Sequence, residues 1–357
     1  MEPRDLSAQV AYQAGRGIEE VAREHGIDPG DLVKLASNEN PFGPSPAAVD
    51  AIREAAGNAS SYPKASHTDL TAELAERWNV KPAQVWLANG GDGALDYLAR
   101  AMLDPGDTVL VPKPGFAYYG MSARYHHGEV REYPLSKDDG FALAADTVLS
   151  EYDGERIVYL TSPHNPSGGR FSLDAVEAIA NETDDWTLVL VDEAYGEYAD
   201  APSAISLLDD RDDVAVLRTF SKAFGLAGVR LGYAVVPDDW ADAYARVNTP
   251  FAASELACRG GLAALSDDEH VEKSVETTRW AREYIYDHLD APTWESHGNF
   301  VLAEVGAASA VTAAVQERGV ILRDCTSFGL PDCVRLTCGT RDETRRAVSE
   351  LNEVLAE

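Results

Sequence analysis

The sequence predicts an α/β protein with a large domain, built on a mainly parallel sheet flanked by helices, and a smaller α+β domain. Short apolar runs alternate with helical patterns between residues 85 and 237, which is typical of a sheet covered by helices on both faces. From about residue 250 the pattern changes to a long helical stretch followed by short strands. A chain of 357 residues is long enough for two domains that each bury a core.

Six apolar runs are the predicted strands of the large domain. In chain order they are VWLANGG, TVLVPKPG, RIVYLTSPHNPSGG, TLVLVDEAYGEY, VAVLRTF and LGYAVVP. The predicted strands of the small domain, FVLAEV, VILRD and CVRLTCG, follow a helical stretch over residues 253–289. We expect residues 1–40 to form an arm packed on the small domain, 41–248 to form the large domain and 249–357 the small domain. Ligands of open α/β sheets bind beyond the carboxyl ends of the strands, so the chemistry is expected there.

A glycine-rich turn connects the first of these strands to a helix. Glycines at 90, 91 and 93 allow close backbone approach, and the start of the helix offers unpaired N–H groups and a positive dipole end. This combination suits a phosphate group. A plain tight turn explains the same residues, so the motif carries little weight alone.

Two polar side chains follow later strands. Asn165 stands before Pro166 in a loop, where it is either a turn residue or an amide held rigidly at a site. Asp192 ends a continuous apolar run, so its carboxylate would lie at the sheet edge and need a positive or hydrogen-bonding partner. Capping of the next helix is the other explanation for Asp192.

The stretch LRTFSKAFGLAGVR contains Lys222, one of only seven lysines in the chain. Thr219 and Ser221 can donate hydrogen bonds to phosphate oxygens, and the planar guanidinium of Arg230 can pair with the same group. A lysine amine becomes a nucleophile when burial or neighbouring cations disfavour its charged form. With a carboxylate and an amide on preceding strands, these residues meet the needs of pyridoxal phosphate, whose aldehyde condenses with a lysine and whose ring nitrogen pairs with a carboxylate.

The charge of the chain excludes one class of partner. Sixty acidic residues oppose thirty basic ones, and a formal net charge of −30 repels a nucleic-acid backbone. Acidic residues also serve ordinary solubility, but the scarcity of lysine and runs such as LLDDRDD favour adaptation to high salt.

Four cysteines lack the C-x-x-C spacing of a metal site, so we expect no metal and reduced, buried thiols. No apolar run is long enough to span a membrane, and the first residues lack the pattern of a signal peptide. These observations predict a cytoplasmic protein.

Several motifs resemble those of the fold-type I pyridoxal-phosphate enzymes, and most closely those of the histidinol-phosphate aminotransferase family. They are LASNENPFGPSP, YPK, SPHNPSG, VDEAYGEY, RTFSKAFGLAGVRLGY and VRLTCGT, and they extend from about residue 35 to 340. The resemblance implies transfer of the amino group of histidinol phosphate to 2-oxoglutarate in a homodimer with shared active sites.

The resemblance also implies a role for each matching residue. Lys222 would form a Schiff base with the cofactor and shuttle a proton, and Asp192 would pair with the ring nitrogen. Asn165 and Tyr195 would hydrogen-bond the 3-oxygen of the ring, and Phe116 would stack on the ring face. The groups implied to hold the cofactor phosphate are the backbone of Gly91, Asp92 and Gly93 and the side chains of Thr219, Ser221 and Arg230.

Further roles concern the substrate and the second subunit. Arg335 and Arg323 would hold the substrate phosphate, or a carboxylate of glutamate, with Asn165 beside them. Tyr62 would reach the active site of the partner subunit. A surface salt bridge is the other explanation for each arginine.

Other activities share these motifs. Threonine-phosphate decarboxylase and an aromatic amino acid aminotransferase stay open as alternatives, whereas a non-catalytic regulator would need a DNA-binding module for which the chain has no room. The sequence departs from the family pattern at Gly93, at the lysine of YPK and at His164. His67, His126 and His127 receive no role.

Overall fold

The computed structural model describes residues 6, 7, 9, 11, 15–64 and 67–357, whose strands form one sheet of seven strands and one of four. The larger sheet has the order β2-β8-β7-β6-β5-β3-β4 and is parallel except at β8, which runs antiparallel to both neighbours. Its strands are β2 (Val85–Ala88), β3 (Thr108–Lys113), β4 (Glu129–Pro134), β5 (Ile157–Thr161), β6 (Leu188–Asp192), β7 (Val214–Thr219) and β8 (Gly232–Val235). The predicted α/β class with a mainly parallel sheet is confirmed.

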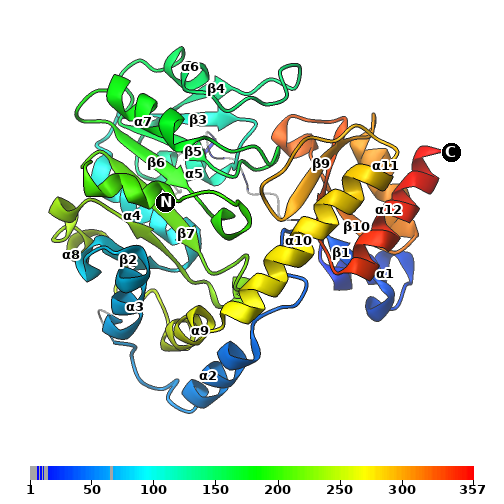
Figure 1. Ribbon diagram of the computed structural model, residues 1–357, viewed down its shortest axis with the longest axis horizontal. Coiled ribbons are helices and arrows are strands. Elements are labelled where there is room, and N and C mark those ends of the chain that lie inside the picture. Colours follow the sequence, from blue (N-terminus) through cyan, green and yellow to red (C-terminus); the bar gives the residue numbers. More distant parts are fainter. Residues whose placement is uncertain (1–5, 8, 10, 12–14, 65–66) are drawn as a thin grey trace, which may run out of the picture.

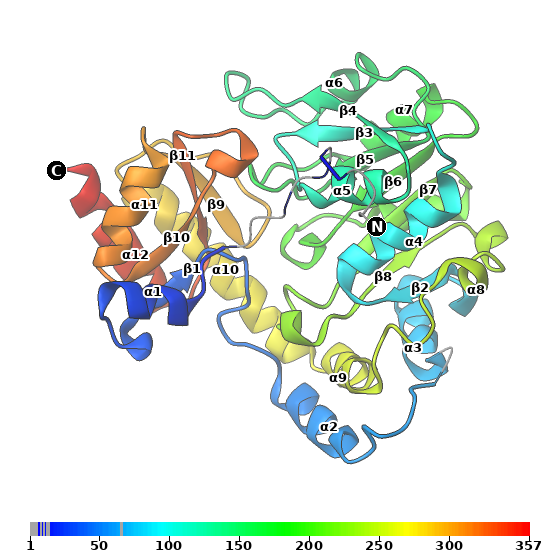
Figure 2. The same cartoon turned by 180° about the vertical axis from the view of Figure 1, so that it is seen from behind.

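Each face of the larger sheet buries its own apolar cluster, because successive side chains of a strand point to opposite faces. In β6, Val189 and Val191 join a cluster with helices α7 (Leu173–Glu182) and α9 (Glu255–Leu265), whereas Leu188 and Leu190 join one with helices α4 (Gly90–Met102) and α5 (Tyr118–Tyr125). Figures 1 and 2 show helices on both sides of this sheet. The helices around it are α2 (Pro46–Ala56), α3 (Thr68–Trp78), α4 (Gly90–Met102), α5 (Tyr118–Tyr125), α6 (Ala145–Leu149), α7 (Leu173–Glu182), α8 (Tyr244–Val247) and α9 (Glu255–Leu265).

The smaller sheet has the order β1-β10-β11-β9, with β1 parallel to β10 and the other pairs antiparallel. Its strands are β1 (Val33–Leu35), β9 (Phe300–Glu304), β10 (Val320–Asp324) and β11 (Cys333–Thr337). The helices beside it are α1 (Ile18–His25), α10 (Asp268–His288), α11 (Ala308–Glu317) and α12 (Arg341–Leu355). Residues 33–35, predicted as part of an arm, are thus a strand of this sheet.

The predicted long helical stretch is two helices. The side chain of Asp267 accepts a hydrogen bond from a backbone N–H of the first turn of α10, which starts a new helix there. Helix α9 packs on α2, where a Cβ on Gly260 would lie 2.8 Å from Ile52 Cδ1. Helix α9 therefore lies with the larger sheet, and α10 extends from it to the smaller one (Figure 1). The division into 41–248 and 249–357 stays a prediction.

Helix α10, with 21 residues, carries many charges. Neither it nor any other helix in the described part of the chain is long and apolar enough to cross a membrane.

Candidate active site

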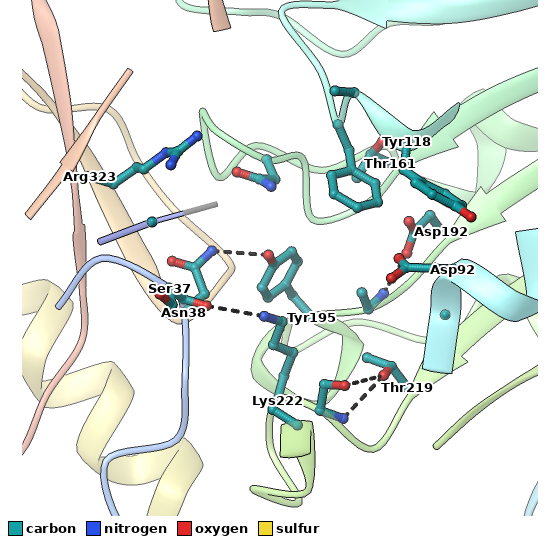
Figure 3. Close-up of a pocket in the computed structure, with 18 of the residues that line it drawn as sticks. Ser37, Asn38, Asp92, Tyr118, Thr161, Asp192, Tyr195, Thr219, Lys222 and Arg323 are labelled. Atoms are coloured by element: carbon teal, nitrogen blue, oxygen red, sulfur yellow. Dashed lines mark hydrogen bonds between the residues drawn. The ribbon is translucent and has the colours of Figure 1, made fainter. Parts of the chain in front are cut away.

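A cavity of about 750 Å³ lies between the carboxyl ends of the parallel strands and the smaller sheet. Figure 3 shows side chains from both sides pointing into it. The predicted site residues that line it are Gly91, Asp92, Phe116, Asn165, Asp192, Tyr195, Thr219, Ser221, Lys222, Arg230, Arg323 and Arg335. The fold thus brings together residues that are spread over some 240 positions of the sequence.

Lys222 follows β7 and extends its amine into this cavity. Its Nζ lies 3.4 Å from the carbonyl oxygen of Ser37 and 5.5 Å from the centre of the Tyr195 ring (Figure 3). Burial, together with the positive charges of Arg335 and Arg230, lowers the pKa of Lys222 to about 8. A much larger fraction of this amine is neutral near pH 7 than for an ordinary lysine, so it can act as a nucleophile or a base.

Asp192 is the last residue of β6, and only 5 % of it is exposed. Its Oδ2 accepts a 2.6 Å hydrogen bond from the Tyr119 hydroxyl, and its Oδ1 accepts one of 2.9 Å from the Ala194 backbone N–H. Burial raises the pKa of Asp192 to about 6, although the hydrogen bonds from Tyr119 and Ala194 each lower this pKa. A buried carboxylate of this kind favours a positively charged partner such as a protonated ring nitrogen.

The start of α4 forms a cradle for an anion. Gly90 has φ +77°, and a Cβ there would lie 2.5 Å from Arg230 Nη2, so only glycine lets the guanidinium lie over the helix start. Arg230 pairs with Asp92 at 3.1 Å. Across the cradle, the Thr219 hydroxyl donates to Ser221 Oγ at 3.0 Å. Backbone N–H groups, two hydroxyls and a guanidinium are the donors that a phosphate needs.

Asn165 and Tyr195 lie between the two sheets. The Tyr195 hydroxyl accepts a 3.0 Å hydrogen bond from Asn38 Nδ2, and burial raises the pKa of Tyr195. Asn165 Oδ1 accepts a hydrogen bond from Arg335. Both side chains therefore have partners that fix their direction at the cavity wall.

Arg323 and Arg335 lie directly opposite each other on the antiparallel strands β10 and β11. Like charges at paired positions repel, so this arrangement is costly unless it binds an anion. Arg335 is 5 % exposed and also donates to the Ala36 carbonyl oxygen at 3.1 Å, whereas Arg323 donates to Ser327 Oγ at 2.9 Å. The centre of the Phe328 ring lies 5.5 Å from Cζ of Arg323 and 5.9 Å from Cζ of Arg335.

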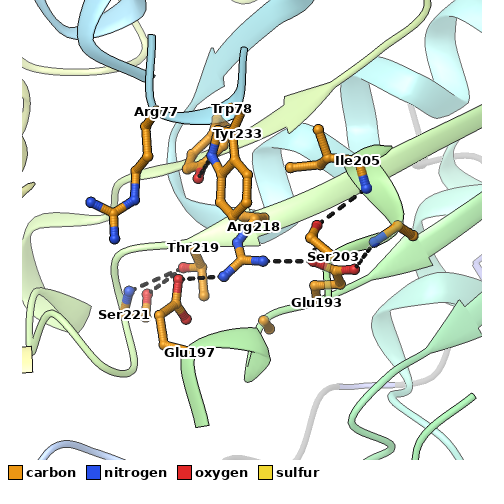
Figure 4. Close-up of polar contacts among 12 residues, drawn as sticks. Arg77, Trp78, Glu193, Glu197, Ser203, Ile205, Arg218, Thr219, Ser221 and Tyr233 are labelled. Carbon is orange, nitrogen blue, oxygen red and sulfur yellow. Dashed lines mark hydrogen bonds and ion pairs between the residues drawn. The ribbon is translucent and has the colours of Figure 1, made fainter. Parts of the chain in front are cut away.

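A buried network of ion pairs connects β7 with the segment that follows β6 (Figure 4). Arg218 donates at 2.6 Å to Glu193 and at 2.6 Å to Glu197. Because side chains alternate along a strand, Asp192 and Thr219 line the cavity while their neighbours Glu193 and Arg218 do not. The network connects the ends of β6 and β7, which carry the carboxylate and the lysine segment.

Two predicted residues do not line the cavity. Gly93 lies in the first turn of α4 and is not among the residues that line the cavity, so the predicted contact of its backbone with a phosphate stays a prediction. Tyr62 is 84 % exposed and stacks on Phe251 with ring centres 4.9 Å apart. Its predicted action is on the partner subunit, which stays a prediction.

The family described as aminotransferase class I and II matches residues 30–351. This chain belongs to that family. A histidinol-phosphate aminotransferase from Haloarcula marismortui is 74 % identical over 357 residues, which is 100 % of this chain and 99 % of that protein. One from Natronomonas pharaonis is 70 % identical over 355 residues, with 99 % and 100 % of the two chains covered. These relatives come from halophilic archaea, which supports the predicted salt-adapted source.

Among solved structures, this aminotransferase is similar to histidinol-phosphate aminotransferase from Sinorhizobium meliloti in complex with pyridoxal-5′-phosphate. The TM-score is 0.87 at 28 % identity, with 99 % of this chain and 97 % of that chain covered. The resemblance inferred from the sequence motifs is confirmed by these relatives and by the fold.

Sequence reasoning missed several polar residues at the wall of the aminotransferase site. Asn38 lies in the motif LASNENP, which indicated the family but received no role. Thr161 lies in a predicted strand and Tyr119 received no role, and only the folded chain shows that their hydroxyls meet near Asp192.

Proposed function

We propose that this aminotransferase moves the amino group of L-histidinol phosphate to 2-oxoglutarate, giving imidazole-acetol phosphate and glutamate, with pyridoxal phosphate as its cofactor. The main support is one cavity that has a lysine of lowered pKa and an anion cradle on one side and a pair of arginines on the other. The names of relatives at 70 % and 74 % identity support the substrate, and the S. meliloti complex supports the cofactor.

Pyridoxal phosphate, when bound, supplies an aldehyde that joins to amines and a ring that withdraws electrons from them. The cradle at the start of α4, with Thr219, Ser221 and Arg230, fits its phosphate. Asp192 would pair with the ring nitrogen. The Asn165 amide and the Tyr195 hydroxyl would bind the 3-oxygen of the ring. Phe116 would cover the ring face, since it lines the same cavity.

The reaction needs a base next to the carbon that bears the amino group, and Lys222 would supply it. With a pKa of about 8, its Nζ could accept a proton from this carbon near neutral pH and hold it for return. Arg323 and Arg335 would hold the substrate phosphate in one half-reaction and a carboxylate of the keto acid in the other. One pair of cations thus serves two different anions.

The proposed dimer explains the exposure of Tyr62. An aromatic side chain that is 84 % exposed, beside Phe251 at 45 %, is unusual for a monomer surface and suits an interface. We place Tyr62 of each subunit at the site of the other. Mixed dimers of Tyr62→Ala and Lys222→Ala chains should regain activity that neither homodimer has, because one of their two sites is intact. Failure to regain activity would contradict the shared site.

The proposed location is the cytoplasm. All four cysteines are free and buried, which fits a reducing compartment.

The substrate is tested by absorbance of the purified protein in high KCl. Histidinol phosphate alone should bleach the yellow band of the bound cofactor, and 2-oxoglutarate should restore it. A band that ignores histidinol phosphate but responds to O-phosphothreonine with release of carbon dioxide would indicate a decarboxylase instead. No band after addition of pyridoxal phosphate would exclude the cofactor.

A further inference from the structure

The hydroxyl of Tyr119 makes the shortest hydrogen bond that Asp192 receives. Tyr119 lies in α5 and is fully buried, and its O–H donates to Asp192 Oδ2 at 2.6 Å. The same oxygen lies 2.8 Å from Thr161 Oγ1. Because the single phenolic proton goes to the carboxylate, the Thr161 hydroxyl must donate to Tyr119. A short chain of hydroxyls thus ends on the carboxylate.

The ring of Tyr119 is held as firmly as its hydroxyl. It stacks on Tyr159 with centres 4.7 Å apart, and Phe116 meets it edge-on at 5.5 Å. Phe116 lines the cavity and is the residue expected on the face of the cofactor ring. Tyr119 therefore contacts both Phe116 and the carboxylate of Asp192, the two residues expected at the ring face and at the ring nitrogen of the cofactor.

We propose that Tyr119 is a positioning residue that fixes the carboxylate of Asp192 for the ring nitrogen of the cofactor. The inference rests on the proposed function, because it assigns Asp192 to that nitrogen. The Ala194 N–H binds Oδ1 and the Tyr119 O–H binds Oδ2, so the two hydrogen bonds fix the plane of the carboxylate. Each oxygen keeps a further lone pair that can accept a hydrogen bond from a ligand. Charge-assisted hydrogen bonds of this length are about twice as strong as neutral ones.

Electrostatics support the same role. Burial and the nearby charges of Asp92 and Glu193 all raise the pKa of Asp192, and the Tyr119 hydrogen bond opposes them. Without this donor, the ionised form that attracts a protonated ring nitrogen is less favoured.

A purely structural role makes a different prediction. Tyr159, in the same stack, has a buried hydroxyl without a hydrogen-bond partner among the described residues. A stack that served packing alone would tolerate phenylalanine at both positions. Tyr159→Phe is therefore the matched control for Tyr119→Phe, since each removes one buried hydroxyl and keeps the ring.

The test is the affinity of cofactor-free protein for pyridoxamine 5′-phosphate, measured by calorimetry in high KCl. This form has the same ring but no aldehyde, so it binds reversibly. Its 1-deaza analogue, in which a C–H replaces the ring nitrogen, is the second ligand. Tyr119→Phe should weaken binding of pyridoxamine phosphate about tenfold, as expected for loss of a hydrogen bond to a charged group. It should leave binding of the analogue unchanged, and Tyr159→Phe should change neither.

Equal weakening for both ligands would show a packing defect and overturn the inference, as would unchanged affinity for both. If the unsubstituted protein binds neither ligand, the proposed function fails and the inference with it. If only the inference about Tyr119 is wrong, the unsubstituted protein still binds both ligands, which distinguishes this outcome from failure of the proposed function.

Discussion

The lowered pKa of Lys222 is the residue property on which the proposed chemistry depends most. Its amine is near two arginines that also line the cavity, and burial adds to their effect. The ordinary value for lysine is 10.5, so the folded protein shifts the neutral form into the working range.

The rate at which cofactor-free protein captures pyridoxal phosphate should therefore follow the titration of Lys222. Only the neutral amine attacks an aldehyde, so the rate should rise with pH, with a midpoint at about 8, and level off above it. Stopped-flow absorbance measures this rate, and Lys222→Ala protein is the control. A midpoint near 10.5 would mean that the cavity does not perturb the amine.

Single residues were predictable where a polar side chain ends an apolar run. Asp192 stood out for that reason and Lys222 because it is one of seven lysines and has hydroxyl groups beside it, whereas nothing in the sequence distinguished Tyr119 from other aromatic residues. His164 was left without a role because its contacts join distant loops: Nε2 donates to the Pro114 carbonyl oxygen at 3.0 Å and Nδ1 accepts from Ser167 at 2.8 Å. Burial lowers the pKa of His164 to about 4, consistent with a neutral ring that ties these loops together. Periodicity along a chain cannot reveal such contacts.

At the scale of elements, the pairing of β10 with β11 brings Arg323 opposite Arg335, the two residues that we propose hold the substrate anion. Arg323→Gln or Arg335→Gln should lower kcat/KM for histidinol phosphate roughly 10- to 100-fold, because a hydrogen-bonded charge is lost from the anion. Arg335→Gln should have the larger effect, since Arg335 is the more buried.

Steady-state kinetics measures this loss. The control is Arg345→Gln, which removes an exposed arginine whose partner is Asp342 on α12. Unchanged kcat/KM in both cavity variants would exclude the arginine pair as the anion site.

The ends of β6 and β7 are connected by the buried ion network, and its removal should cost stability. Arg218→Met would leave Glu193 and Glu197 buried without their cation, and the cation also lies 4.6 Å from the Trp78 ring centre. The free energy of unfolding should fall by about 3–5 kcal/mol.

Urea denaturation in high KCl measures the effect of Arg218→Met. Arg53→Met, at an exposed pair on α2, should change the free energy of unfolding by less than about 0.5 kcal/mol. If Arg218→Met changed the free energy of unfolding as little as Arg53→Met does, the network would contribute nothing to the stability of the fold.

Elements were predictable where the pattern was strong. The six predicted strands of the larger sheet are all present, but β4 was missed because charged residues such as Glu129, Arg131 and Glu132 interrupt it. Strand β4 is at the edge of the sheet, where charge is tolerated and discourages pairing with other chains. The break between α9 and α10 was missed because residues on both sides favour a helix, and the Asp267 cap that starts α10 is a single residue.

At the scale of the whole molecule, we expect the net charge of −30 to make the stability of the protein depend on salt. Most ion pairs of the described residues are at least partly exposed and contribute little, so mutual repulsion of carboxylates dominates at low ionic strength. The melting temperature should fall as KCl is removed by dialysis. Sucrose should not replace KCl, because it does not screen charge. A melting temperature indifferent to KCl would contradict salt adaptation.

We predict that Lys222, out of seven lysines, is the one that bonds to the cofactor. The most direct test is reduction of the protein with borohydride in the presence of pyridoxal phosphate, followed by mass spectrometry of its peptides. We predict one cofactor adduct per chain, on Lys222, and none in Lys222→Ala protein. An adduct at another lysine, or no adduct at all, would show that Lys222 is not the residue that bonds to pyridoxal phosphate.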